Sequence, residues 1–176
     1  HAVDSLNMLW SAHNSRLILL FYGLARSGYL LQKLQLPCSP TENFSSLVEE
    51  VVKELRRYVK MMDEWCTITD INYLSWIKFL QAQIEELSGN HGAAIQHYEH
   101  ALDHATEHDS AFNEALGNYL MAGLFIRRSA RRAPRSALLE AVGLFRQMGA
   151  IGVLKAIEEE HSLLLHGLIR NHRTNH

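Results

Sequence analysis

The chain is poor in cysteine, proline and net charge. Its two cysteines, Cys38 and Cys66, have a spacing that matches no metal-binding or redox motif. It has three prolines, and long stretches lack glycine, which favours helix. The net charge of −2 gives no overall attraction to nucleic acid or to an anionic membrane. From these absences we expect a helical protein that works in the reducing environment of the cytoplasm. We expect no cofactor.

The sequence also lacks a long hydrophobic run and a recognisable active-site motif. The most apolar segment, residues 17–24, is far shorter than the roughly 20 residues that cross a bilayer. No glycine-rich phosphate loop and no Ser/His/Asp or Cys/His arrangement is evident, so we expect no catalysis in this segment. The first residues, His1-Ala2-Val3, resemble no signal peptide. We interpret the chain as an excerpt of a larger protein.

What the sequence does contain is a period near 3.6 residues in every long segment, which predicts an all-α fold. The expected helices cover about residues 4–34, 41–62, 71–87, 91–107, 110–127, 134–148 and 151–168. The first helix has candidate breaks near Asn14 and Gly23. We expect one helical-repeat domain over residues 1–170 and a frayed tail over residues 171–176.

A helix-pair repeat signature lies between residues 82 and 101. Ala82 precedes Gly89 by seven residues, and Ala94, Tyr98 and Ala101 follow on one helix face. The small residues allow two helices to approach closely, and the glycine forms the turn between them. This pattern is typical of the tetratricopeptide repeat, a helix-turn-helix of about 34 residues. It predicts antiparallel helix pairs stacked into a right-handed superhelix.

Residues 55–165 resemble the tetratricopeptide-like region of large, mainly fungal and bacterial, signalling proteins. The residues that carry this resemblance are Gly89, Ala94, Tyr98, Ala101, Glu114-Ala115-Leu116, Asn118, Ala137-Leu138, Glu140-Ala141, Phe145 and Gly149-Ala150. Those proteins combine a protein-kinase-like domain, a STAND-type ATPase module, this helical region, a GAF domain and often a hybrid histidine kinase. The resemblance implies a regulatory role in a two-component or related signal-transduction system.

A peptide-binding groove is the first candidate site. In tetratricopeptide-like stacks the first helix of each pair lines the concave face, and exposed aromatic side chains there are good anchors. The predicted groove residues are Trp76, Phe79, Gln83, Glu86, Asn113 and Asn118. The alternative is that Trp76 and Phe79 pack against a neighbouring helix.

A histidine stripe is the second candidate, with His97, His100, His104 and His108 within an arc of about 80° on one helix. We place it beside the buried face and near solvent. Imidazoles one turn apart can share Zn, Ni or Cu. The simpler interpretation is a solvated polar stripe, so we assign no metal.

An arginine cluster is the third candidate and surrounds the loop after residue 127. It consists of Arg127, Arg128, Arg131, Arg132 and Arg135. Such a patch suits an anion or an acidic partner. The alternative is a solvated loop. Residues 158–160, all glutamate, are most simply the outer face of the last helix, with pairing to these arginines as the other interpretation.

The preferred hypothesis is a non-catalytic module that binds a peptide segment or a neighbouring domain of the same protein. We expect no nucleic acid and no membrane as partner. The apolar surface of the first helix, with Trp10, Leu17, Leu20, Phe21 and Leu24, suits either a preceding repeat or a homodimer. Two alternatives stay open: an effector-binding domain of a STAND-type regulator, and a metal-binding protein that uses the histidine stripe.

Overall fold

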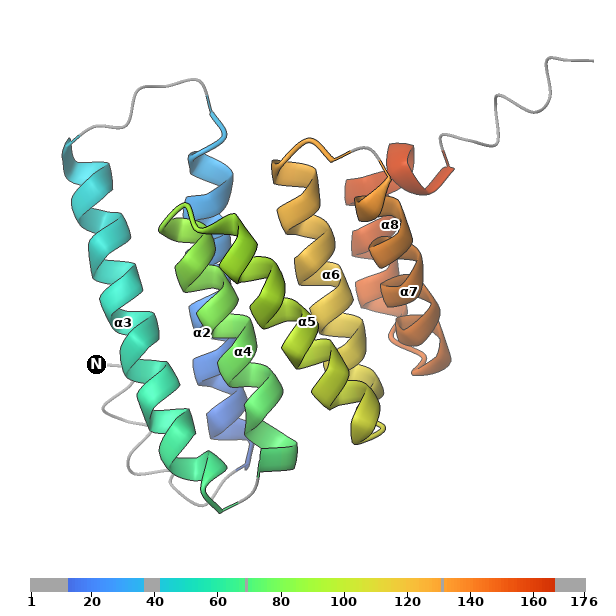
Figure 1. The fold of residues 1–176 in the computed structure, drawn as a ribbon. Helices are drawn as coiled ribbons and strands as arrows, with labels where there is room; N and C mark the ends of the chain where they lie inside the picture. Colours follow the sequence, from blue (N-terminus) through green and yellow to red (C-terminus); the bar gives the residue numbers. More distant parts are fainter. Residues whose placement is uncertain (1–12, 37–41, 69, 131, 167–176) are drawn as a thin grey trace, which may run out of the picture. The chain divides into compact units, whose positions relative to one another are not determined.

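The computed structural model describes residues 13–36, 42–68, 70–130 and 132–166. Within these ranges the chain is all-α, with seven helices and no strand, as predicted (Figure 1). The helices are α2 (His13–Lys33), α3 (Glu42–Cys66), α4 (Asp70–Leu87), α5 (His91–Glu107), α6 (Ala111–Arg127), α7 (Ala133–Gln147) and α8 (Ile151–His166).

Most helix ends lie within two residues of the prediction. Two differences are larger. The helix α3 continues to Cys66, four residues beyond its expected end. The helix α2 runs unbroken from His13 to Lys33, so the candidate break near Gly23 is absent. The expected start of that helix and the tail at 171–176 lie outside the described residues.

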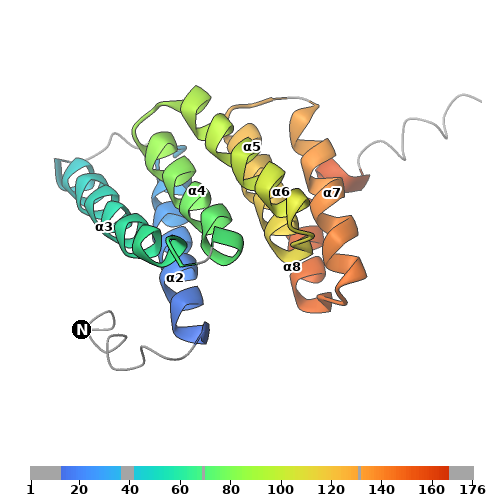
Figure 2. The same cartoon turned by 60° about the horizontal axis from the view of Figure 1, so that its bottom comes forward.

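The chain divides into two compact units, residues 1–97 and residues 98–176, with the boundary inside α5. In the first unit α4 packs against both α2 and α3. In the second unit α7 packs against both α6 and α8. Figure 2 shows the neighbouring pairs α3 and α4, and α6 and α7, within their respective units. A single domain over residues 1–170 and a superhelical arrangement of the pairs stay predictions.

Large side chains fill the first unit. Leu20 is fully buried on α2, Leu55 and Tyr58 are buried on α3, and Leu80 is buried on α4. Gly23 of α2 lies against side chains of both neighbouring helices. A methyl group at Gly23 would lie 2.9 Å from Leu55 Cδ2 and 3.0 Å from Leu80 Cδ2. A glycine is therefore required here for close packing, because a side chain at this position would overlap the leucines of the two neighbouring helices.

Small side chains form the contact between α6 and α7 in the second unit. Ala115 and Ala122 lie on one face of α6, and Ala137 and Ala141 lie on α7. All four belong to the same buried cluster. The larger members of that cluster are Leu138, Val142, Phe145, Ile157 and Leu165. Alanines on both sides allow the two helix axes to approach closely. That these helices form a repeat stays a prediction.

Four successive helices end with the same turn. A residue with positive φ follows each helix: Gly89 (81°), Asp109 (51°), Ser129 (55°) and Gly149 (69°). The next residue then donates its N–H to a carbonyl five positions back, at 2.8–3.0 Å; Asn90 to Glu85, for example. This is the bond that closes a Schellman-type helix end. The turn at Gly89 was expected, whereas those at Asp109 and Ser129 were not, because neither is glycine.

Candidate functional site

The predicted groove residues of α4 are buried. Trp76 is 4% exposed, Phe79 is fully buried, and Gln83 and Glu86 are 2% and 4% exposed. The prediction that these four side chains are exposed in a groove is therefore wrong. Their burial favours the alternative, in which the two aromatic rings pack inside the structure.

The two groove residues expected on α6 are also engaged locally. Asn113 is buried. Asn118 is half-buried and donates from its side-chain amide to the carbonyl of Glu114, at 3.0 Å. A partner-binding role for Asn113 and Asn118 stays a prediction.

An exposed apolar face lies instead on α2, and we call it the α2 face. It consists of Ile18, Tyr22, Ala25 and Tyr29, which are spaced by four, three and four residues. Ile18, Tyr22 and Tyr29 are 53%, 42% and 57% exposed. Spacings of this kind place side chains in one narrow stripe along a helix.

The surface that the sequence suggested for a homodimer differs from the α2 face. Of its residues, Leu20 is fully buried, Leu17 and Leu24 are half-buried, and Phe21 is exposed. Trp10 lies outside the described residues. The placement of Leu20 at an interface is therefore wrong, because its side chain belongs to the core of the first unit. The continuous apolar run of residues 17–24 concealed which of its members point outward.

A hollow of about 330 Å³ lies beside the α2 face, between α2 and α3. Its lining is largely apolar and consists of Tyr22, Ala25, Arg26, Tyr29, Leu30, Leu47 and Val51. Leu30 and Val51 are buried and form its apolar part, while the two exposed tyrosines stand at its edge. The arrangement gives α2 a shallow hollow next to a row of exposed apolar side chains.

Arg26 is the one cation among the described residues that line this hollow. Its guanidinium binds the carboxylate of Glu54 at 2.7 Å and that of Glu50 at 3.5 Å, and it lies 5.8 Å from the centre of the Tyr22 ring. Glu54 in turn accepts a hydrogen bond of 2.6 Å from the Tyr58 hydroxyl. Burial, together with the hydrogen bond to Glu54 and its charge, raises the pKa of Tyr58. The ion pairs of Arg26 join α2 to α3.

The predicted arginine cluster surrounds the loop between α6 and α7. Arg128 and Arg132 are exposed, Arg127 and Arg135 are half-buried, and Arg131 lies outside the described residues. A methyl group at Gly123 would lie 3.0 Å from Arg127 Nη1, so this side chain folds back along α6. An anion-binding role for the cluster stays a prediction.

The acidic run of α8 has other neighbours. Glu158 lies 3.9 Å from Arg146 of α7, and Glu159 lies 3.9 Å from Lys155. Glu160 accepts a hydrogen bond of 3.1 Å from the Tyr119 hydroxyl of α6 and lies 3.8 Å from His161. Pairing of these glutamates with the arginines of the loop stays a prediction.

Tyr119, Glu160 and His161 form a polar cluster that joins α6 to α8. The helix α8 departs from helical geometry at His161, where φ is −120° and ψ is 24°. The His161 ring lies 6.2 Å from the Tyr119 ring. Burial and the adjacent Glu160 carboxylate raise the pKa of Tyr119 to about 12, against a smaller opposing effect of Arg127. This cluster could not be seen in the sequence, because Tyr119 lies 41 residues from Glu160.

Tyr119 should make the folded state less stable at alkaline pH. The folded chain holds the phenol proton more tightly than the unfolded chain, so its contribution is complete below pH 10 and is lost as the pH rises to about 12. We expect the tyrosinate absorbance of the native chain to contain a component with a pKa near 12, which the Tyr119→Phe variant lacks. The denatured chain is the control, since there Tyr119 titrates near pH 10. Identical high-pH titration curves for the native chain and the variant would contradict this assignment.

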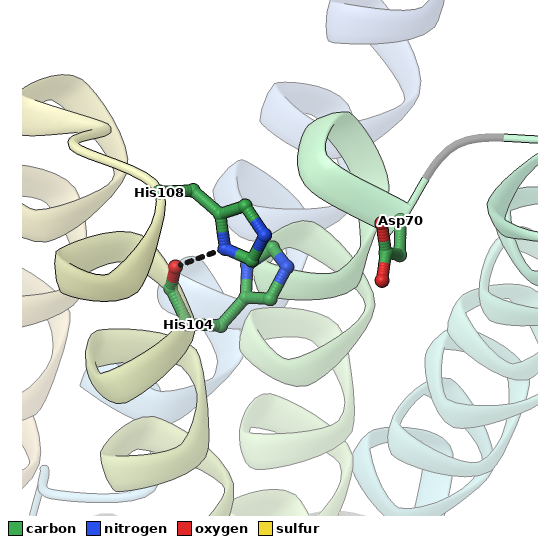
Figure 3. Close-up of side chains that lie close together, drawn as sticks. All are labelled: Asp70, His104 and His108. Atoms are coloured by element: carbon green, nitrogen blue, oxygen red, sulfur yellow. Dashed lines mark hydrogen bonds between the residues drawn. The ribbon is translucent and has the colours of Figure 1, made fainter.

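The histidine stripe of α5 is less exposed than expected. His100 is exposed, His97 and His108 are half-buried, and His104 is only 7% exposed. The expectation that the whole stripe lies near solvent is therefore wrong for His104. The structure also brings two of the four rings together, since the centres of His104 and His108 lie 4.3 Å apart (Figure 3).

Cys66 ends α3 and is half-buried with a free thiol. Burial raises the pKa of this thiol, and the carboxylates of Asp70 and Asp63 raise it further. A raised pKa disfavours the thiolate, which is the nucleophilic form. The surroundings of Cys66 are thus the reverse of those that activate a catalytic cysteine.

No family model, curated protein or solved structure matches the chain. Among the described helices, none is long and apolar enough to cross a membrane. The function therefore has to be argued from the residues themselves.

Proposed function

We propose that the chain is a non-catalytic helical interaction module that holds a helical segment of a neighbouring domain or partner on its α2 face. The observation that carries this proposal is the exposed row of Ile18, Tyr22, Ala25 and Tyr29 beside the hollow between α2 and α3. The role in a cytoplasmic multidomain signalling protein, which the family resemblance implies, is part of the same proposal.

The spacing of the α2 face suits a second helix. Side chains that alternate three and four residues apart form the seam along which two helices pack. Ala25 stands in the middle of the row, and its small side chain lets a second helix axis approach α2 closely. Tyrosine is a common interface residue, because its ring gives apolar contact while its hydroxyl stays hydrated.

The hollow supports a docked segment rather than an enclosed effector. Its edge is formed by Tyr22 and Tyr29, both more than two-fifths exposed, so it opens to solvent between α2 and α3. One apolar side chain of a docked helix would fill it against Leu30 and Val51. Small-molecule sites typically bury most of the ligand surface, which an open hollow beside a helix does less well.

Selection from a displayed peptide library tests the proposal. We expect the folded chain to enrich helix-forming peptides with apolar residues three and four positions apart. Changing Tyr29→Ser or Ile18→Asp should weaken their binding about 10-fold or more, as for central interface residues. The matched control is Ile68→Asp, because Ile68 is 84% exposed in the same unit but lies outside the α2 face.

Two results would reject the proposal. One is the absence of any enriched helical peptide. The other is enrichment of peptides that bind the Tyr29→Ser and Ile18→Asp variants as tightly as the unchanged chain. Helix content measured by circular dichroism shows that each variant is folded before its binding is compared.

A further inference from the structure

Two histidine rings lie side by side at the carboxyl end of α5. His104 is in the last turn of the helix, and His108 follows one turn later. Their ring centres are 4.3 Å apart, with an angle of 35° between the ring planes. Figure 3 shows the two rings projecting from the same side of the helix end.

A hydrogen bond fixes which nitrogen of His108 carries the proton. Its Nδ1 lies 2.9 Å from the main-chain carbonyl oxygen of His104. A carbonyl oxygen only accepts, so Nδ1 is the donor and carries the hydrogen. In the neutral ring Nε2 then has a bare lone pair. Histidines that bind metals commonly use this arrangement, in which the second ring nitrogen donates to a carbonyl or a carboxylate.

The spacing of the two rings suits one shared ion. A ring nitrogen of His104 and one of His108 lie within 4.8 Å of each other. An ion bound to two imidazole nitrogens at 2.0–2.1 Å holds those nitrogens roughly 3–4 Å apart. Binding of one ion by both nitrogens therefore requires rotation of the half-buried His108 ring from the position described.

The position at the helix end also favours a cation. The carboxyl end of a helix carries partial negative charge from its carbonyl groups. The chain leaves the helix directly after His108, at Asp109, where φ is 51°. Ser110 N–H then bonds to the carbonyl of Ala105 at 2.8 Å, which closes the helix end and holds the segment that bears both histidines.

We propose that His104 and His108 form a binding site for a divalent transition metal of the Zn, Ni or Cu class. Imidazole nitrogen suits these ions, whereas Mg and Ca prefer oxygen ligands. Water or further side chains complete the coordination. The bound ion would tie His104, inside the helix, to His108, beyond its last residue, and so stabilise the carboxyl end of α5. This site is independent of the α2 face and of the function proposed for it.

Titration of the full chain, without an added histidine tag, tests the site. The probes are Zn²⁺, Ni²⁺ and Cu²⁺ in competition with a coloured chelator. The chain contains 11 histidines, so the comparison between variants matters rather than the total uptake. We expect His108→Gln to lose one equivalent of bound ion or to bind it at least 10-fold more weakly. His100→Gln, one turn before His104 and exposed, is the matched control and should bind as the unchanged chain does.

A second measurement separates ligation from folding, because His104 is buried and its replacement affects packing. Nitrogen chemical shifts of the imidazoles in the unchanged chain report which ring atoms bind Zn²⁺. We expect one nitrogen of His104 and Nε2 of His108 to shift together at one equivalent. Uptake that is unchanged in His108→Gln, an equal loss in His100→Gln, or shifts confined to other histidines would overturn the proposal.

Discussion

Replacing Phe145 by alanine lowers the free energy of unfolding by about 3–5 kcal/mol, the usual cost of removing a buried aromatic ring. Phe145 is 4% exposed on α7 and belongs to the buried cluster that α7 shares with α6 and α8. The surrounding helices close the resulting space only in part, so contacts are lost as well as apolar burial. Chemical denaturation followed by circular dichroism measures the change.

The matched control for Phe145 is Leu139→Ala on the same helix. Leu139 is 43% exposed, so its truncation should cost less than about 1 kcal/mol. A cost for Phe145→Ala as small as that of Leu139→Ala would show that the second unit is not packed as described.

The same variant also tests how the two units unfold. The two tryptophans among the described residues, Trp65 and Trp76, belong to the first unit. Tryptophan fluorescence therefore reports the first unit, while circular dichroism reports all helices. If the two units unfold together, Phe145→Ala shifts both transitions equally. If they unfold separately, the fluorescence transition stays in place.

A leucine at Gly23 should destabilise the first unit by at least about 1–3 kcal/mol, the usual cost of overpacking. Even a methyl group there would lie 2.9 Å from Leu55 Cδ2 and 3.0 Å from Leu80 Cδ2. The rest of a leucine side chain has no space between α2 and its two neighbours. Either α2 moves away from α3 and α4, or the buried leucines leave their preferred rotamers.

Gly28 on the same helix is the control for Gly23. A methyl group at Gly28 meets nothing within 4 Å. The Gly28→Ala change should therefore stabilise the chain by about 0.5–1 kcal/mol, because alanine favours helix and glycine does not. The two substitutions thus have opposite expected signs in denaturant unfolding. A stable Gly23→Leu variant would show that the three helices do not approach as closely as described.

Helices could be predicted from the sequence far better than the exposure of single side chains. The range 91–107 matches α5, because a glycine turn and a polar end mark its two limits in the sequence. Burial depends on neighbours that are distant along the chain. Periodicity could not show that Trp76 is covered, nor that Tyr22 and Tyr29 are left outside.

The candidate sites could be predicted only in part, because their geometry also depends on how the chain folds. The histidine stripe was found from spacing alone, since spacing determines which residues share a helix face. The bond from His108 to the His104 carbonyl depends on how the chain leaves the helix at Asp109. A positive φ at an aspartate has no clear signal in sequence, so this part of the site required the structure.

The repeated turns at Gly89, Asp109, Ser129 and Gly149 have a consequence for how fast the chain folds. In the second unit the turns at Ser129 and Gly149 join α6 to α7 and α7 to α8, and the helices of each pair pack against each other. Contacts between chain neighbours cost little loop-closure entropy, and helical proteins rich in them fold in microseconds to milliseconds. The second unit should therefore fold quickly from its own residues, with its turns formed before distant segments meet.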